Sequence, residues 1–110
     1  MKLAIISNAP PFAEQVIVTT GLGDLVDFYL VSCYVGYEKP HPRIFELALS
    51  KACVSPSEAI HVGDSYYHDV VGAEGVGITP VLLDGSGRYA CEDLGDCIRI
   101  ESLSELLSIV

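Results

Sequence analysis

The sequence predicts an α/β fold in which helices cover a parallel β-sheet, and two observations lead to this expectation. Short apolar segments with the length of strands alternate with segments that have the spacing or length of helices. The first apolar segment, residues 3–6, does not alternate with polar residues, which is typical of a parallel strand buried on both faces. The chain has 110 residues, the length of one domain, so we expect a single domain over residues 1–110.

The first half of the chain predicts two strands and two helices. Residues 2–7 are the first expected strand, and the two prolines that follow open a helix over residues 12–20. A second apolar run predicts a strand at residues 28–35. The second helix, residues 42–52, begins with proline and carries apolar side chains at helical spacing, so one face is expected to be buried.

The second half predicts three strands and two helices. Residues 59–62 are the third expected strand, and a short helix over residues 68–74 follows, weakened and ended by glycines. The fourth strand is expected at residues 79–83 and a short edge strand at residues 97–100. A serine precedes the last expected helix, residues 103–109, and a glutamate occupies its third position, which is a capping box.

Composition and charge exclude several classes of partner. The net charge of −9 argues against binding to nucleic acid or to an anionic membrane, although a small phosphorylated substrate is compatible with one local lysine and a cation. No apolar run has the length of an export signal or of a membrane span. The four cysteines form no Cys-x-x-Cys pair, and a cytoplasmic location is expected.

The segment Ile60–Asp69 is the most informative part of the chain. An apolar strand ends in Gly63-Asp64, and Asp69 follows five residues later. Gly63 is expected to permit a sharp turn that presents Asp64 at the carboxyl edge of the sheet, where open α/β folds bind ligands. Two carboxylates on one loop suit Mg²⁺, whereas the alternative is a plain strand-to-helix connection with Asp69 near the helix start. His61, inside the strand, is expected to be a satisfied core or packing histidine rather than a ligand.

Two further loops carry polar groups suited to an anion. Ser7 and Asn8 follow the first strand, where a hydroxyl and backbone N–H groups can bind phosphate oxygens; the alternative is a turn in which Asn8 bonds its own backbone. Lys39 precedes Pro40 and is therefore expected to be extended. Its ammonium group can neutralise phosphoryl oxygens, or it is simply a solvated surface lysine.

These motifs occur in the order strand-Ser-Asn, Lys-Pro-x-Pro-x-Ile-Phe and strand-Gly-Asp-x4-Asp, and together they resemble the haloacid dehalogenase superfamily. The resemblance covers nearly the whole chain. It implies a three-layer, Rossmann-like α/β/α core and a magnesium-dependent phosphatase that acts through an aspartyl intermediate. By resemblance, Ser7 and Asn8 bind the phosphoryl group, Lys39 neutralises it and the nucleophile, and Asp64 ligates the metal. Asp69 is expected to support the metal shell or to orient Lys39.

The sequence departs from this family in its first motif. The family's nucleophilic Asp-x-Asp strand and its helical cap would precede Met1, and no Asp-x-Asp occurs in the chain. Asp84 also follows a strand, but it is expected to belong to the turn after the fourth strand. We therefore expect part of a core domain that lacks the central strand, binds Mg²⁺ weakly and is inactive or nearly so alone. His41 replaces an Asp that is common in relatives; a structural role is expected, with a pH-dependent charge as the alternative.

The missing strand would leave apolar edges that need to be covered. Direct pairing of residues 3–6 with residues 60–63 is the favoured expectation, and a homodimer or an upstream fragment is the alternative. Three functions remain open: a catalytically incomplete hydrolase fragment, a non-catalytic module that binds phosphate or a phosphometabolite, and one half of a two-chain enzyme.

Overall fold

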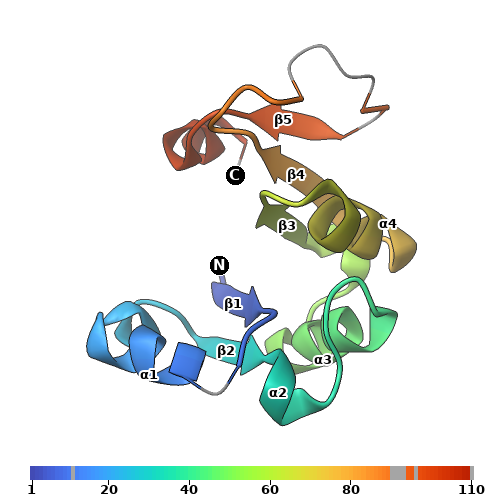
Figure 1. Ribbon diagram of the computed structural model, residues 1–110. Helices are drawn as coiled ribbons and strands as arrows, with labels where there is room; N and C mark the ends of the chain where they lie inside the picture. Colours follow the sequence, from blue (N-terminus) through green and yellow to red (C-terminus); the bar gives the residue numbers. More distant parts are fainter. Residues whose placement is uncertain (11, 90–93, 96, 110) are drawn as a thin grey trace. The chain divides into compact units, whose positions relative to one another are not determined.

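The computed structural model describes residues 1–10, 12–89, 94–95 and 97–109. The chain divides into two compact units, Met1–Val54 and Ser55–Val110, and each unit contains its own small parallel sheet (Figure 1). Strands and helices occur in each unit and every strand pairing is parallel, so the predicted α/β class is confirmed. No helix within the described residues is both long and apolar enough to span a bilayer.

The first unit begins with a two-stranded sheet. Strand β1 (Ala4–Ser7) pairs with β2 (Phe28–Val31), and helix α1 (Phe12–Thr19) connects them. The start of the sheet is tied by two hydrogen bonds of 2.7 Å, because Leu3 N–H donates to the Asp27 carboxylate and Asp27 N–H donates to the Leu3 carbonyl. Because β1 and β2 are parallel, the residues that follow each strand lie at the same carboxyl edge of the sheet.

The second expected strand is shorter than predicted. After Val31 the chain forms the one-turn helix α2 (Ser32–Val35), which ends at Gly36 with a φ of 84°. The apolar run continues through this helix, so hydrophobicity alone did not reveal where the strand ends. A left-handed backbone at Gly36 favours glycine and closes the helix.

Helix α3 (Pro42–Ala52) has the predicted bounds and carries the core of the first unit. Ile44 and Phe45 are fully buried. The Nδ1 atom of His41 accepts a hydrogen bond of 3.0 Å from Arg43 N–H and so caps the helix. Aspartate commonly fills this capping position, which explains how His41 replaces it and confirms the expected structural role.

The second unit contains a three-stranded sheet in the order β3-β4-β5. Strand β3 (Ile60–Gly63) pairs with β4 (Thr79–Leu83), which pairs with the edge strand β5 (Ile98–Ile100). The buried side chains of Val70, Ala73, Val81 and Leu82 form its core.

The helical segments of the second unit are short and of several types. A 3₁₀ turn, η2 (Pro56–Glu58), precedes β3, and a π-helix, η3 (Tyr66–Val71), follows it and continues into α4 (Gly72–Gly75). The last element, η4 (Leu103–Ser108), is a 3₁₀ helix rather than an α-helix. Its predicted capping box, formed by the serine and the glutamate, is present.

The division into two sheets corrects one expectation. Strands β1 and β3 belong to different sheets, and no pairing of residues 3–6 with residues 60–63 exists in the part of the chain that the structure describes. Both strands are incompletely buried: Leu3, just before β1, is 54% exposed and Ile60 is 40% exposed. Parallel strands are usually buried on both faces, so these two strands are only partly covered by the rest of their units.

Candidate functional site

The Asp64 loop lies at the carboxyl end of β3. Asp64 is exposed, and within the described residues its carboxylate makes no hydrogen bond or ion pair. Ser65 caps the following π-helix, because its Oγ accepts a hydrogen bond of 3.2 Å from His68 N–H. A π-helix is rare and often marks a functional position. The loop therefore presents one available carboxylate at the end of a parallel strand.

Asp69 is buried behind this loop. It is 4% exposed, its Oδ1 lies 2.9 Å from His61 Nε2, and its Oδ2 accepts a hydrogen bond of 3.1 Å from Ser65 N–H. The carboxyl group of Asp69 also occupies the space that a Cβ at Gly63 would need. Gly63 has no positive φ, so a close approach of Asp69, rather than the expected sharp turn, requires glycine here.

The Asp64 loop offers a metal one carboxylate. The described residues contain no group of three or more His, Cys, Asp or Glu side chains that could hold a metal. Mg²⁺ binds through one or two carboxylates and otherwise keeps waters or phosphate oxygens, so the exposed Asp64 fits as one ligand. The hydrogen bonds and burial of Asp69 fit the supporting role expected for it.

Ser7, Asn8 and Lys39 lie in the first unit, and the structure brings Asn8 and Lys39 together. Asn8 Nδ2 donates to the Lys39 carbonyl at 2.8 Å, and Lys39 N–H donates to Asn8 Oδ1 at 2.7 Å. The amide of Asn8 thus holds the backbone of the lysine loop, rather than its own backbone as in the alternative turn. Ser7 ends β1, and its hydroxyl makes no hydrogen bond within the described residues. The Lys39–Pro40 peptide bond is cis.

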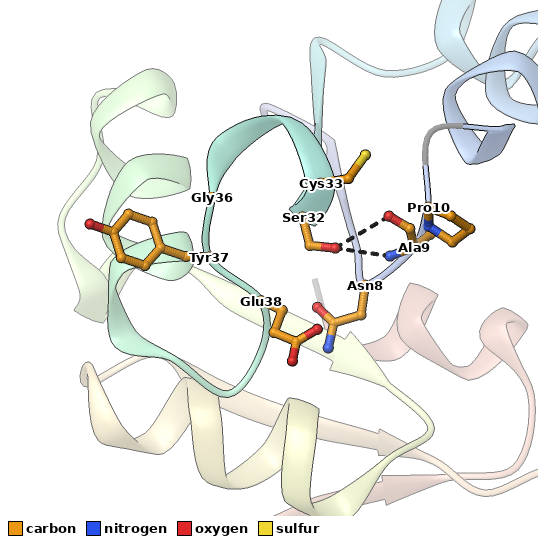
Figure 2. A pocket seen from close by; sticks show the side chains of 8 residues that line it. All are labelled: Asn8, Ala9, Pro10, Ser32, Cys33, Gly36, Tyr37 and Glu38. Atoms are coloured by element: carbon orange, nitrogen blue, oxygen red, sulfur yellow. Dashed lines mark hydrogen bonds between the residues drawn. The ribbon is translucent and has the colours of Figure 1, made fainter.

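A surface cavity of about 670 Å³, wide open to solvent, lies beside Asn8 (Figure 2). Its lining residues are Asn8, Ala9, Pro10, Ser32, Cys33, Gly36, Tyr37 and Glu38. The Ser32 hydroxyl accepts from Ala9 N–H at 3.0 Å and donates to the Ala9 carbonyl at 3.3 Å, so it joins helix α2 to the loop after β1. Glu38 is the one charged residue in this lining, so the cavity itself offers no cation to an anion.

Asp84 is held in the turn that follows β4, as predicted. Its carboxylate accepts hydrogen bonds from the backbone of Arg88 at 2.9 Å and of Tyr89 at 2.8 Å, and Arg99 Nε lies 2.8 Å away. Burial raises the pKa of Asp84, but the N–H of Tyr89, the Arg99 guanidinium and the N–H of Arg88 together hold the pKa below its usual value. Asp84 therefore stabilises a loop and is not a free nucleophile.

The predicted site residues thus fall into two groups, one in each unit. Asn8 and Lys39, with Ser7 beside Asn8, belong to the first group, and Asp64 with Asp69 belongs to the second. The structure agrees with the expectation of a satisfied core histidine at His61, but sequence reasoning did not identify Asp69 as its hydrogen-bond partner. A polar side chain inside an otherwise apolar strand, eight residues before a carboxylate, was the signal available.

Comparison with known proteins identifies the family. A sequence model of haloacid dehalogenase-like hydrolases matches residues 1–77. The chain is 42% identical, over 97% of its length, to haloacid dehalogenase-like hydrolase domain-containing protein 3 from Mus musculus, of which it covers 44%. It is 40% identical, over 82% of its length, to glyceraldehyde 3-phosphate phosphatase from Pyrococcus furiosus, of which it covers 38%.

A solved structure extends the likeness to the fold. The HAD phosphatase from Thermococcus onnurineus superposes with a TM-score of 0.90 at 34% identity, over 98% of this chain and 49% of that one. The chain therefore spans less than half the length of these relatives. The ordered Ser-Asn, Lys-Pro and Gly-Asp loops and these similarities lead to one conclusion: the chain belongs to the haloacid dehalogenase-like hydrolase family and has its Rossmann-like α/β fold.

Proposed function

We propose that this chain provides the phosphate-binding loops and the metal-binding loop of a magnesium-dependent phosphatase that acts on a small phosphorylated molecule. The observation that carries the proposal is the pair of hydrogen bonds, 2.8 and 2.7 Å long, between the amide of Asn8 and the backbone of Lys39. These bonds hold the loop after β1 against the lysine loop. The phosphatase names of relatives such as the Pyrococcus furiosus protein support the same reaction class.

Each loop has a defined part in this proposal. The Ser7 hydroxyl donates to a phosphoryl oxygen, and the Lys39 ammonium neutralises its charge. Asp64 would hold the metal, and a bound Mg²⁺ would supply positive charge for phosphoryl transfer. The cavity beside Asn8 accommodates the rest of the substrate, and its single charged residue, Glu38, disfavours a second anionic group there.

We further propose that the 110-residue chain has little or no phosphatase activity alone. Covalent phosphoryl transfer needs a nucleophile, and the sequence contains no Asp-x-Asp motif to provide one. Strands β1 and β3 each have one edge without a paired strand in the described residues. An upstream segment or a second copy of this chain would add a strand there.

A cytoplasmic location is also proposed. Among the described residues, Cys33, Cys53 and Cys97 are free thiols, which supports this location.

Titration with inorganic phosphate tests the anion site. Changes in amide chemical shifts on adding phosphate are expected to saturate for the wild-type chain and for Lys51→Met, but to be lost in Lys39→Met. The Lys51 control removes the same charge from the same unit, where its ammonium lies 5.7 Å from the Phe28 ring and outside the proposed site. Equal affinities in the two variants would show that Lys39 does not bind the anion.

Turnover of p-nitrophenyl phosphate with Mg²⁺ tests the incomplete active site. The chain alone is expected to show no more activity than Asp64→Asn, and addition of a fragment with an Asp-x-Asp strand is expected to restore turnover. Strong activity that survives Asp64→Asn would contradict the proposal. Saturable phosphate binding without restored turnover would instead favour a non-catalytic binding module.

A further inference from the structure

His61 is a polar side chain in the middle of strand β3. Its side chain is 13% exposed, and its Nε2 atom lies 2.9 Å from Asp69 Oδ1. An ionised carboxylate only accepts hydrogen bonds, so the proton of this bond is on His61 Nε2. A buried imidazole N–H needs an acceptor, and here the acceptor is a carboxylate that makes a further hydrogen bond to the Asp64 loop.

The same carboxylate contacts the residues on both sides of Asp64. Asp69 Oδ2 accepts a hydrogen bond from Ser65 N–H at 3.1 Å, and the carboxyl group lies directly against Gly63. The residues on both sides of Asp64 thus contact this carboxylate. The other oxygen, Oδ1, lies 2.9 Å from His61 Nε2.

We propose that His61 is a positioning residue for the Asp64 loop. Its Nε2–H orients the Asp69 carboxylate, and Asp69 in turn fixes the Ser65 amide and directs the Asp64 carboxylate outward from the end of β3. This role rests on the proposed function in one respect, because Asp64 is taken there as the metal ligand. Side chains that orient a metal ligand through an intermediate group change affinity for the metal without touching it.

Two substitutions at one position separate orientation from packing. In His61→Gln, the side-chain amide nitrogen lies about as far from the backbone as the Nε2 atom of histidine and can still donate to Asp69. In His61→Asn, the amide nitrogen is about one bond closer to the backbone, near the position of Nδ1 in histidine, and does not reach Asp69. Both variants are neutral, polar and smaller than histidine. A role in packing predicts similar effects, but a role in positioning predicts that only His61→Gln rescues the loop.

Nuclear magnetic resonance gives two readouts in the full 110-residue chain. The Ser65 amide is expected to exchange slowly with solvent in the wild type and in His61→Gln, and faster in His61→Asn. With Mn²⁺ as the probe, paramagnetic broadening at residues 63–65 is expected to give a dissociation constant at least about tenfold higher for His61→Asn and within about threefold of wild type for His61→Gln.

Several results would overturn the proposal. Unchanged Ser65 exchange in His61→Asn, or equal changes in the two variants, would show that His61 only packs. If His61→Asn fails to fold, the imidazole nitrogen shifts of the wild type decide: an Nε2–H tautomer supports the proposal and an Nδ1–H tautomer refutes it. Absence of Mn²⁺ binding to the wild type would count against Asp64 as a metal ligand, while Ser65 exchange and the tautomer still test His61.

Discussion

Replacing Gly63 with alanine tests whether the close approach of Asp69 determines the stability of the Asp64 loop. A Cβ at Gly63 would overlap the carboxyl group and the Cβ of Asp69. That side chain cannot move aside freely, because it is 4% exposed and its two oxygens bond to His61 and to Ser65 N–H. The extra methyl group must therefore displace a hydrogen-bonded, buried carboxylate.

The expected loss follows from these contacts. Inserting a methyl group into a packed site costs about 1–3 kcal/mol. Displacing Asp69 also breaks at least one hydrogen bond to a charged group, each worth about 1.5–3 kcal/mol. Allowing for partial relaxation, the free energy of unfolding is expected to fall by about 2–4 kcal/mol, a large part of the about 5–15 kcal/mol that is usual for a domain.

Urea denaturation followed by circular dichroism measures this loss, with Gly75→Ala as the matched control. A Cβ at Gly75, which ends α4, meets no atom within 4 Å, and the residue has no positive φ. The control is therefore expected to leave stability unchanged or to raise it by about 0.4–1 kcal/mol. A Gly63→Ala protein as stable as the control would refute the view that Asp69 requires glycine at this position.

Three other substitutions have expected outcomes. Asn8→Ala removes both hydrogen bonds to the Lys39 backbone. Because these bonds are exposed, the free energy of unfolding measured in urea is expected to fall by only about 1 kcal/mol. Phosphate binding is expected to weaken, and unchanged binding would contradict the role of Asn8. His41→Asp places a negative charge at the N-terminus of α3, where the helix dipole favours it. The free energy of unfolding is therefore expected to rise by about 0.3–1 kcal/mol at neutral pH. A decrease would show that the ring contact between Tyr37 and His41 contributes more to stability than the cap does. The lowered pKa of Asp84 means that its charge stabilises the fold above its unfolded pKa of about 3.9, and that this contribution is lost as the pH falls through the lower folded pKa. Asp84→Asn should therefore lose less stability than wild type between about pH 5 and pH 2, and equal losses in urea titrations would exclude this residue as a source of acid sensitivity.

Much of the local structure was predictable because its signals lie close together in the sequence. A proline at the first position and apolar residues at helical spacing predicted α3 with its observed bounds, and β4 was also predicted residue for residue. The strand β2 was overextended because its apolar run continues through α2, where only Gly36 marks the end. The π-helix after Asp64 had no recognisable pattern in the sequence.

The candidate site was predictable in its residues more than in their contacts. Ser7, Lys39 and Asp64 were named because each follows a strand or precedes a proline in a motif of a known family. The bond of Asn8 to the Lys39 backbone joins residues 31 positions apart, and neither residue type indicates the other as a partner. His61 was expected to be a satisfied core or packing histidine, but its partner Asp69 was not identified, because burial statistics describe a residue type and not its neighbours.

The sequence by itself determined the α/β class, the order of the five strands, the family and the loops that carry its polar groups. These properties depend on periodicity, turn residues and short motifs, which are local. Only the tertiary structure decided that Asp69 lies on Gly63 between His61 and Ser65, and that β1 and β3 belong to separate sheets. Such contacts and pairings depend on how closely side chains and strands approach one another in the folded chain. The spacing of residues along the sequence does not specify these distances.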